Sequence, residues 1–115
     1  MADTKEKCGG TTITYPSECA YWCICTSSGC FWTVKCNGTV FTGEGLTTPK
    51  PPKHPIVTVS GNLATIAQIL EKRLKRPVRV PAKLKRRKIR RRRIKGTQEQ
   101  VAEVLGLELG PRRRA

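Results

Sequence analysis

The chain has 115 residues, of which 37% are hydrophobic, and its formal net charge is +15 at pH 7. A chain of this length forms one ordinary domain or two very small ones, and this apolar content is low for a deep core. No apolar run is long enough for a transmembrane helix, and the first residues lack the apolar centre of a secretory signal. A chain that starts natively at Met1 is therefore expected in the cytoplasm.

The composition changes abruptly near residue 49. Residues 1–48 contain all six cysteines and every aromatic residue, with three basic and four acidic side chains, whereas residues 49–115 have no cysteine or aromatic and carry twenty basic against four acidic side chains. Between the two parts, four prolines within Thr47 to Pro55 fix the backbone and disfavour regular structure. We predict a cysteine-rich β module at 1–46, a proline-rich linker at 47–55 that includes the solvated His54, a basic domain at 56–109 and a basic tail at 110–115.

Residues 20–43 have the pattern of a small antiparallel sheet. Asn37-Gly38 is the dipeptide favoured in type I′ turns, and β-rich segments flank it from Cys30 to Phe41. With the β-rich run before them, these segments predict a three-stranded meander. Alternation along the strands turns four of the cysteines toward one small core. A sheet of this size needs covalent or metal cross-links to be stable.

The cysteines are the candidate cross-links. Their even number, together with loops rich in Thr, Ser and Gly, favours disulfides, which would place the chain in the periplasm or outside the cell. Zinc is an alternative, although the sequence has no C-x-x-C pair and no histidine nearby, and free thiols are a third. The candidate disulfide or metal residues are Cys8, Cys19, Cys23, Cys25, Cys30 and Cys36.

The first part of the basic domain predicts a strand, a helix and a second strand. The β-branched run that starts at Ile56 suits a strand. Apolar residues from Leu63 to Leu74 then recur with helical spacing, with Asn62 as N-cap and Pro77 as the stop. The valines of "VRVP", which follows, alternate with arginine as in a half-buried strand.

The second part of the basic domain predicts one more helix. Thr97 and Gln100 form a capping box, and Gly106 ends the apolar pattern that follows. If the basic segment before Thr97 is itself a strand, this domain is a βαββα two-layer unit. The predicted fold class is thus α+β, a small cysteine-rich antiparallel β meander followed by the βαββα unit.

Residues 56–109 resemble the short N-terminal domain of secretins and TonB-dependent receptors, the STN domain. The shared features are the "TIAQILEK" helix, a valine-rich strand ending in "VPAKL", a strand closing in "IKGT", and the "QEQVAEVLGL" helix. The resemblance implies the βαββα fold and a structural or protein-interaction role in the bacterial envelope. In a regular strand Ile89 and Ile94 would face opposite sides, so we expect either a β-bulge between them or arginine stems lying along the helices.

The segment from Lys72 to Gln98 has fifteen basic residues and no acid. Such a concentration of positive charge attracts phosphate polymers because binding releases condensed counterions, and the planar fork of arginine suits phosphate. A solvated basic run or a localisation signal would explain the same composition. The predicted polyanion-binding residues are Lys83, Lys85, Arg86, Arg87, Lys88, Arg90, Arg91, Arg92, Arg93 and Lys95.

We therefore predict a non-enzymatic, arginine-rich protein whose partner is nucleic acid or another polyanion. Contact with phosphates is favoured over base stacking because this part of the chain has no aromatic side chain. An anionic membrane surface is a second partner class, and the envelope interaction module, binding a protein through sheet edges, is the alternative function. Catalysis is not expected, since the sequence has no Ser/His/Asp arrangement, phosphate-binding glycine loop or carboxylate pair.

Overall fold

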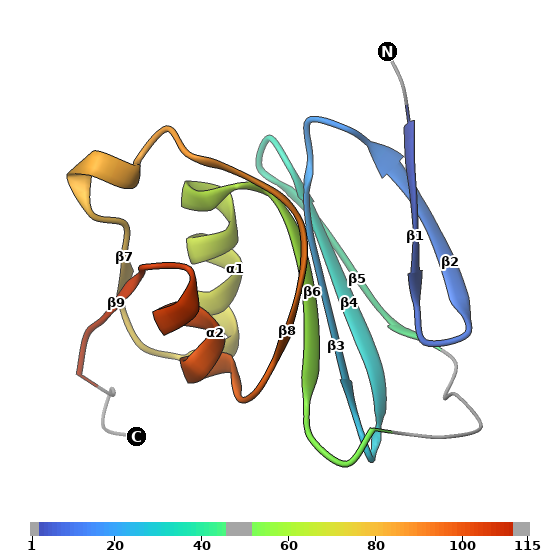
Figure 1. Cartoon of the computed structure of the whole chain (residues 1–115). Helices are drawn as coiled ribbons and strands as arrows, with labels where there is room; N and C mark the ends of the chain where they lie inside the picture. The colour runs from blue at the N-terminus through green and yellow to red at the C-terminus, as the bar shows by residue number, and fades with distance from the viewer. Residues whose placement is uncertain (1–2, 46–51, 112–115) are drawn as a thin grey trace.

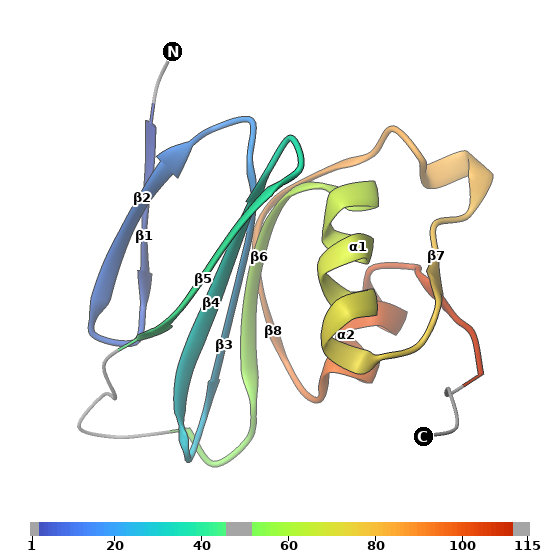
Figure 2. The same ribbon diagram turned by 180° about the vertical axis from the view of Figure 1, so that it is seen from behind.

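A computed structural model describes residues 3–45 and 52–111, and it arranges them in three layers (Figure 1). A five-stranded antiparallel sheet in the order β5-β4-β3-β6-β8 forms the middle layer. The two-stranded hairpin β1–β2 covers one face and the helices cover the other, as the view from behind also shows (Figure 2). The α+β class with antiparallel sheets is confirmed. The elements are β1 (Asp3–Cys8), β2 (Thr11–Pro16), β3 (Ala20–Thr26), β4 (Gly29–Cys36), β5 (Thr39–Gly45), β6 (Ile56–Asn62), α1 (Leu63–Leu74), β7 (Val78–Arg79), a 3-10 turn (Ala82–Leu84), β8 (Lys88–Lys95), α2 (Gln98–Val104) and β9 (Glu108–Leu109).

The predicted meander is present as β3, β4 and β5. Asn37 and Gly38 have φ angles of 34° and 88°, the positive values that a type I′ turn requires between β4 and β5. Alternate residues of β3 and β4 face the hairpin layer, where the buried members of a cysteine-rich cluster include Tyr21, Cys23 and Val34. The predicted common side of the cysteines is thus confirmed.

The two predicted modules share one sheet. β6, the first strand of the basic part, pairs antiparallel with β3 of the cysteine-rich part, from Tyr21 opposite Ser60 to Cys25 opposite Ile56. The division into two modules joined by a spacer therefore needs correction, because the composition changes at residue 49 but the hydrogen-bonded ladder does not stop there. Of the linker, residues 47–51 lie outside the described residues, and His54 is exposed.

Both predicted helices are present with the predicted caps. The side chain of Asn62 accepts a hydrogen bond from the backbone N–H of Ala64 at the start of α1, and Thr97 and Gln100 form the full capping box of α2. The buried face of α1 packs on β3 and β6, so Leu63, Ile66 and Leu70 share one core with Trp22 of β3. Packing against the cysteine-rich part of the chain thus stabilises the helical layer.

The basic segment forms strand β8 with a bulge. Gly61 lies opposite Ile89 and Val59 lies opposite Arg92, so two residues of β8 face the single residue Ser60 of β6. The additional residue turns both Ile89 and Ile94 toward the helices, where both are buried. Of the two expected solutions, the β-bulge is the one observed.

Two elements differ from the sequence-based prediction. β7 does not join the main sheet but pairs with β9, from Val78 opposite Leu109 to Arg79 opposite Glu108. The hairpin β1–β2 was not predicted, although Gly9-Gly10 and the alternation of "TTITYP" are typical of one. β9 follows the second predicted helix, where no strand was predicted, and β1 and β2 precede the predicted meander.

Candidate polyanion-binding surface

The ten predicted basic residues lie in two consecutive segments, the 3-10 turn at the outer side of the helical layer with the loop after it, and the edge strand β8 (Figure 1). Lys83 to Arg87 follow or belong to the 3-10 turn, and Lys88 to Lys95 belong to β8, which ends the strand order of the main sheet. All ten are exposed. We call this set, Lys83, Lys85, Arg86, Arg87, Lys88, Arg90, Arg91, Arg92, Arg93 and Lys95, the basic edge.

The bulge distributes the cations of β8 over two sides of the sheet. Arg93 and Lys95 pair with Thr58 and Ile56, in rows that continue to the cysteines of β3 on the hairpin side. Arg92 pairs with Val59, a residue of the helix-side core. Because the side chains leave the strand in both directions, the edge presents positive charge along its length and not on one flat face.

One residue of the basic edge makes an ion pair across the layers. Arg91 Nε donates to Glu6 Oε2 of β1 at 2.6 Å, and the side chains are 64% and 9% exposed respectively. The carboxylate is therefore held in place while much of the guanidinium remains open to solvent. Glu6 is not predictable as a member of this site, because nothing in the sequence places β1 beside a strand that begins more than eighty residues later.

A tyrosine pair belongs to the buried cluster on the hairpin side of the sheet. The rings of Tyr15 and Tyr21 stack with centroids 5.3 Å apart, and the hydroxyl of Tyr15 is 3.1 Å from that of Ser60. Burial raises the pKa of both phenols above the usual value of about 10, and the Ser60 hydrogen bond partly opposes this for Tyr15. The hairpin thus covers neutral aromatic groups and leaves the arginines at the rim.

All six predicted cysteines are in disulfides. Cys25 and Cys30 join directly opposite positions of β3 and β4, and Cys36 at the end of β4 is joined to Cys19, the residue before β3, at the other end of the ladder. Cys8–Cys23 fastens the end of β1 to β3. Three disulfides are typical of proteins from an oxidising environment, outside the cell or in the periplasm, which is the second branch of the localisation expected from the sequence.

The sulfur atoms of Cys8, Cys23 and Cys25 lie within 4.8 Å of one another. Zinc binds the thiolate and not the disulfide sulfur. Zinc binding at this cluster would therefore first require reduction of the disulfides, and the zinc alternative stays a prediction for the reduced chain.

The opposite edge of the sheet has a different character. β5 exposes Val40 and Phe41, which are 39% and 53% exposed, and carries Glu44 as its single charge. A cleft of about 290 Å³ separates β4 and β5 from α1, and its lining includes Lys35, Lys72 and Arg73. An open, weakly charged edge and a heavily charged, bulged edge thus bound the same sheet.

Comparisons with protein-family models, with curated proteins and with solved structures find no match to this chain. The resemblance to STN domains therefore stays a prediction based on the residues that carry it. None of the helices within the described residues is long and apolar enough to cross a membrane. Of the predicted basic tail, residues 112–115 lie outside the described residues.

Proposed function

We propose that the protein binds a phosphate-bearing polyanion, with nucleic acid as the first partner class, through the basic edge. The observation that carries the proposal is the exposure of all ten basic side chains along one ordered strand and the turn before it. A strand holds its cations at fixed spacings, so less side-chain and backbone freedom is lost on binding than in a disordered basic run.

The local charge balance supports this function. Residues 83–99 contain one acid, Glu99, which follows the basic edge, and Arg91 pairs with Glu6 of β1. The remaining positive potential would be lowered by an anionic polymer, and release of counterions from that polymer would drive binding. Arginines that reach both sides of β8 suit contact with successive phosphates rather than reading of base edges.

The first test measures binding of a fluorescent DNA duplex by anisotropy between about 50 and 200 mM salt. We expect affinity to fall steeply with salt, because each phosphate contact contributes roughly 0.9 to the slope of log affinity against log salt. The variant Arg91→Gln/Arg93→Gln/Lys95→Gln should lose up to about 2.7 of that slope. A binding curve that does not respond to salt, or no binding in dilute buffer, would contradict the proposal.

A matched control separates this surface from net charge alone. The variant Lys72→Gln/Lys75→Gln/Arg79→Gln removes three exposed cations outside the basic edge, so it changes the net charge equally. We expect it to keep nearly the full salt slope. Equal losses in both variants would show non-specific attraction, and binding to anionic vesicles without binding to DNA would assign the surface to membranes.

A second candidate function is protein interaction through the β5 edge, the role that the envelope-module prediction implies. The observation that favours it is the pair Val40 and Phe41, exposed on an edge strand with few charges. Edges of this kind accept an added strand, whereas charged and bulged edges such as β8 resist it. Retention of a protein partner that is insensitive to salt and lost in Phe41→Lys would support this function.

A further inference from the structure

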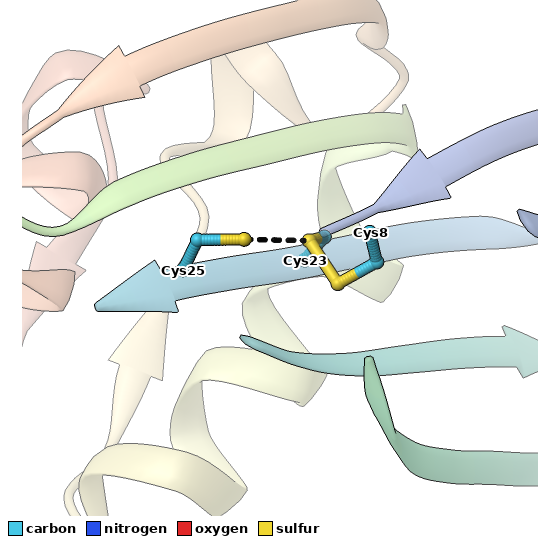
Figure 3. A group of neighbouring side chains, drawn as sticks. All are labelled: Cys8, Cys23 and Cys25. Atoms are coloured by element: carbon cyan, nitrogen blue, oxygen red, sulfur yellow. Dashed lines mark hydrogen bonds between the residues drawn. A yellow bond between two sulfur atoms is a disulfide. The ribbon is translucent and has the colours of Figure 1, made fainter. Parts of the chain in front are cut away.

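Two disulfides contact each other on the hairpin side of the main sheet. Figure 3 shows Cys8, Cys23 and Cys25, and its dashed line joins Sγ of Cys23 to Sγ of Cys25, which are 3.8 Å apart. Both sulfurs belong to disulfides and carry no hydrogen, so this is a van der Waals contact between the Cys8–Cys23 and Cys25–Cys30 bonds. The positions of Cys23 and Cys25, two residues apart on β3, bring the bonds together.

The four cysteines differ in their access to solvent. Cys8 is fully buried and Cys23 and Cys30 are each 3% exposed, whereas Cys25 is only partly buried. A thiol in solution therefore meets Cys25 first and has no direct path to the Cys8–Cys23 bond in the folded chain. The third disulfide, Cys19–Cys36, lies at the other end of the β3–β4 ladder.

We propose that Cys25 is the entry point of a thiol–disulfide exchange site whose substrate is a dithiol reductant. A thiolate of the dithiol attacks Sγ of Cys25, the Cys25–Cys30 bond breaks, and Cys30 leaves as a thiolate that takes up a proton. The second thiol of the reductant then displaces Cys25 from the mixed disulfide. The reductant is oxidised to its own disulfide, and the two electrons reside on Cys25 and Cys30.

In the second step the Cys25 thiolate cleaves the buried Cys8–Cys23 disulfide. The Cys25 thiolate, 3.8 Å from Sγ of Cys23 in the starting structure, attacks it, so a Cys23–Cys25 bond forms and Cys8 leaves as a thiolate. This step is an exchange without net electron transfer. The Cα and Cβ atoms two residues apart on a strand are separated by about 6.7 Å, whereas a disulfide needs Cβ atoms about 3.5 to 4.5 Å apart, so the new bond requires local bending of β3. The new bond is therefore itself open to a second dithiol, and β1 loses its covalent link to the sheet.

The test follows each cysteine in the full chain during treatment with one equivalent of dithiothreitol. Thiols are alkylated at intervals and located by peptide mass spectrometry. We expect Cys30 to be labelled before Cys8, whereas Cys36 is partly buried like Cys25, so the Cys19–Cys36 bond opens independently of this order. In Cys25→Ser/Cys30→Ser, labelling of Cys8 should slow by at least about tenfold, whereas Cys19→Ser/Cys36→Ser, which also lacks one disulfide, should label Cys8 at least as fast as the original chain.

The direction of the effect excludes a trivial cause. Loss of a disulfide loosens a chain and would make Cys8 react faster, so slower labelling cannot result from partial unfolding. Labelling of Cys8 at an equal or higher rate in Cys25→Ser/Cys30→Ser would overturn the proposal. The loop closed by Cys25–Cys30 is also the shortest of the three, with a sequence separation of 5. Removal of this disulfide should therefore reduce the stability of the fold least.

A second variant tests the exchange step without any reductant. In Cys30→Ala the Cys25 thiol is free from the start and lies beside Cys23. We expect purified Cys30→Ala to contain two disulfide isomers, so that alkylation labels both Cys25 and Cys8 in part. Labelling of Cys25 alone, with Cys8–Cys23 intact, would show that the contact does not lead to exchange and would overturn the second step.

Discussion

Within the described residues, two buried side-chain polar groups lack a hydrogen-bond partner, Nε1 of Trp22 and the hydroxyl of Tyr21. Tyr21 is fully buried. A buried polar group without a partner costs about 1 to 3 kcal/mol. Tyr21 nevertheless contributes its ring to the stack with Tyr15, so the aromatic body stabilises the hairpin layer while the hydroxyl opposes it.

We predict that Tyr21→Phe equals or exceeds the original chain in free energy of unfolding and reduces its loss of stability at high pH. The pKa of both tyrosines is raised by burial, so the folded chain keeps phenolic protons that the unfolded chain releases near pH 10. Stability from these groups is fully present below about pH 10 and falls as the pH rises further. Thermal unfolding followed by circular dichroism across this range measures both effects.

Tyrosinate absorbance gives an independent readout. The chain has two tyrosines, and because the pKa of each is shifted upward by burial, the folded protein should ionise less near pH 10 than the denatured chain, which should titrate normally. Normal titration of the folded chain would mean that the phenols are accessible to water, and a loss of more than about 1 kcal/mol in Tyr21→Phe would mean that the hydroxyl has a stabilising partner.

The elements that the sequence predicts well are those with local signals. The caps at Asn62 and Thr97 and the Asn37-Gly38 turn lie next to the elements that they define, and all are present as expected. The basic edge was also predictable, because its charge forbids burial. The contact between Arg91 and Glu6, the pairing of β7 with β9 and the disulfide partners depend on long-range packing, and six cysteines alone allow 15 pairings.

The bulge in β8 leads to a prediction at the level of the element. A regular strand would bury only one of Ile89 and Ile94, but the bulge buries both in the helix-side core. We expect Ile89→Ala and Ile94→Ala each to lower the free energy of unfolding by about 2 kcal/mol or more. Urea denaturation of the two variants measures the losses.

Arg92→Ala provides the control within the same strand, because Arg92 is exposed between the two isoleucines. Its effect should stay within about 0.5 kcal/mol. A small loss for one isoleucine variant together with a large loss for the other would indicate a strand without the bulge, and its arginines would then have to lie along the helices.

At the level of the whole molecule, the central strand β3 joins chemically different parts of the chain. One face of β3 places Cys23 under the hairpin, and the other places Trp22 and Ile24 against the core of the helical layer. The disulfides hold β3 to β4 and β1, and β3 in turn supports β6, on which β8 is paired. The folded conformation of the basic edge therefore depends on the cross-linked part of the chain, which has few charges of its own.

This dependence predicts that the basic part does not fold alone. A fragment of residues 52–115 lacks β3, so β6 and β8 would form a two-stranded sheet and α1 would lose its contact with Trp22. Two-stranded sheets are marginally stable at best in water. We expect narrow amide dispersion in the NMR spectrum of this fragment and no cooperative thermal transition.

Addition of the oxidised fragment 1–51 should restore wide amide dispersion and a cooperative transition, because it supplies β3 with the ladder positions that pair with β6. A cooperative transition in 52–115 alone would instead show that it is an autonomous domain, as its sequence pattern suggests, and that the continuous sheet is a docked interface between two folding units.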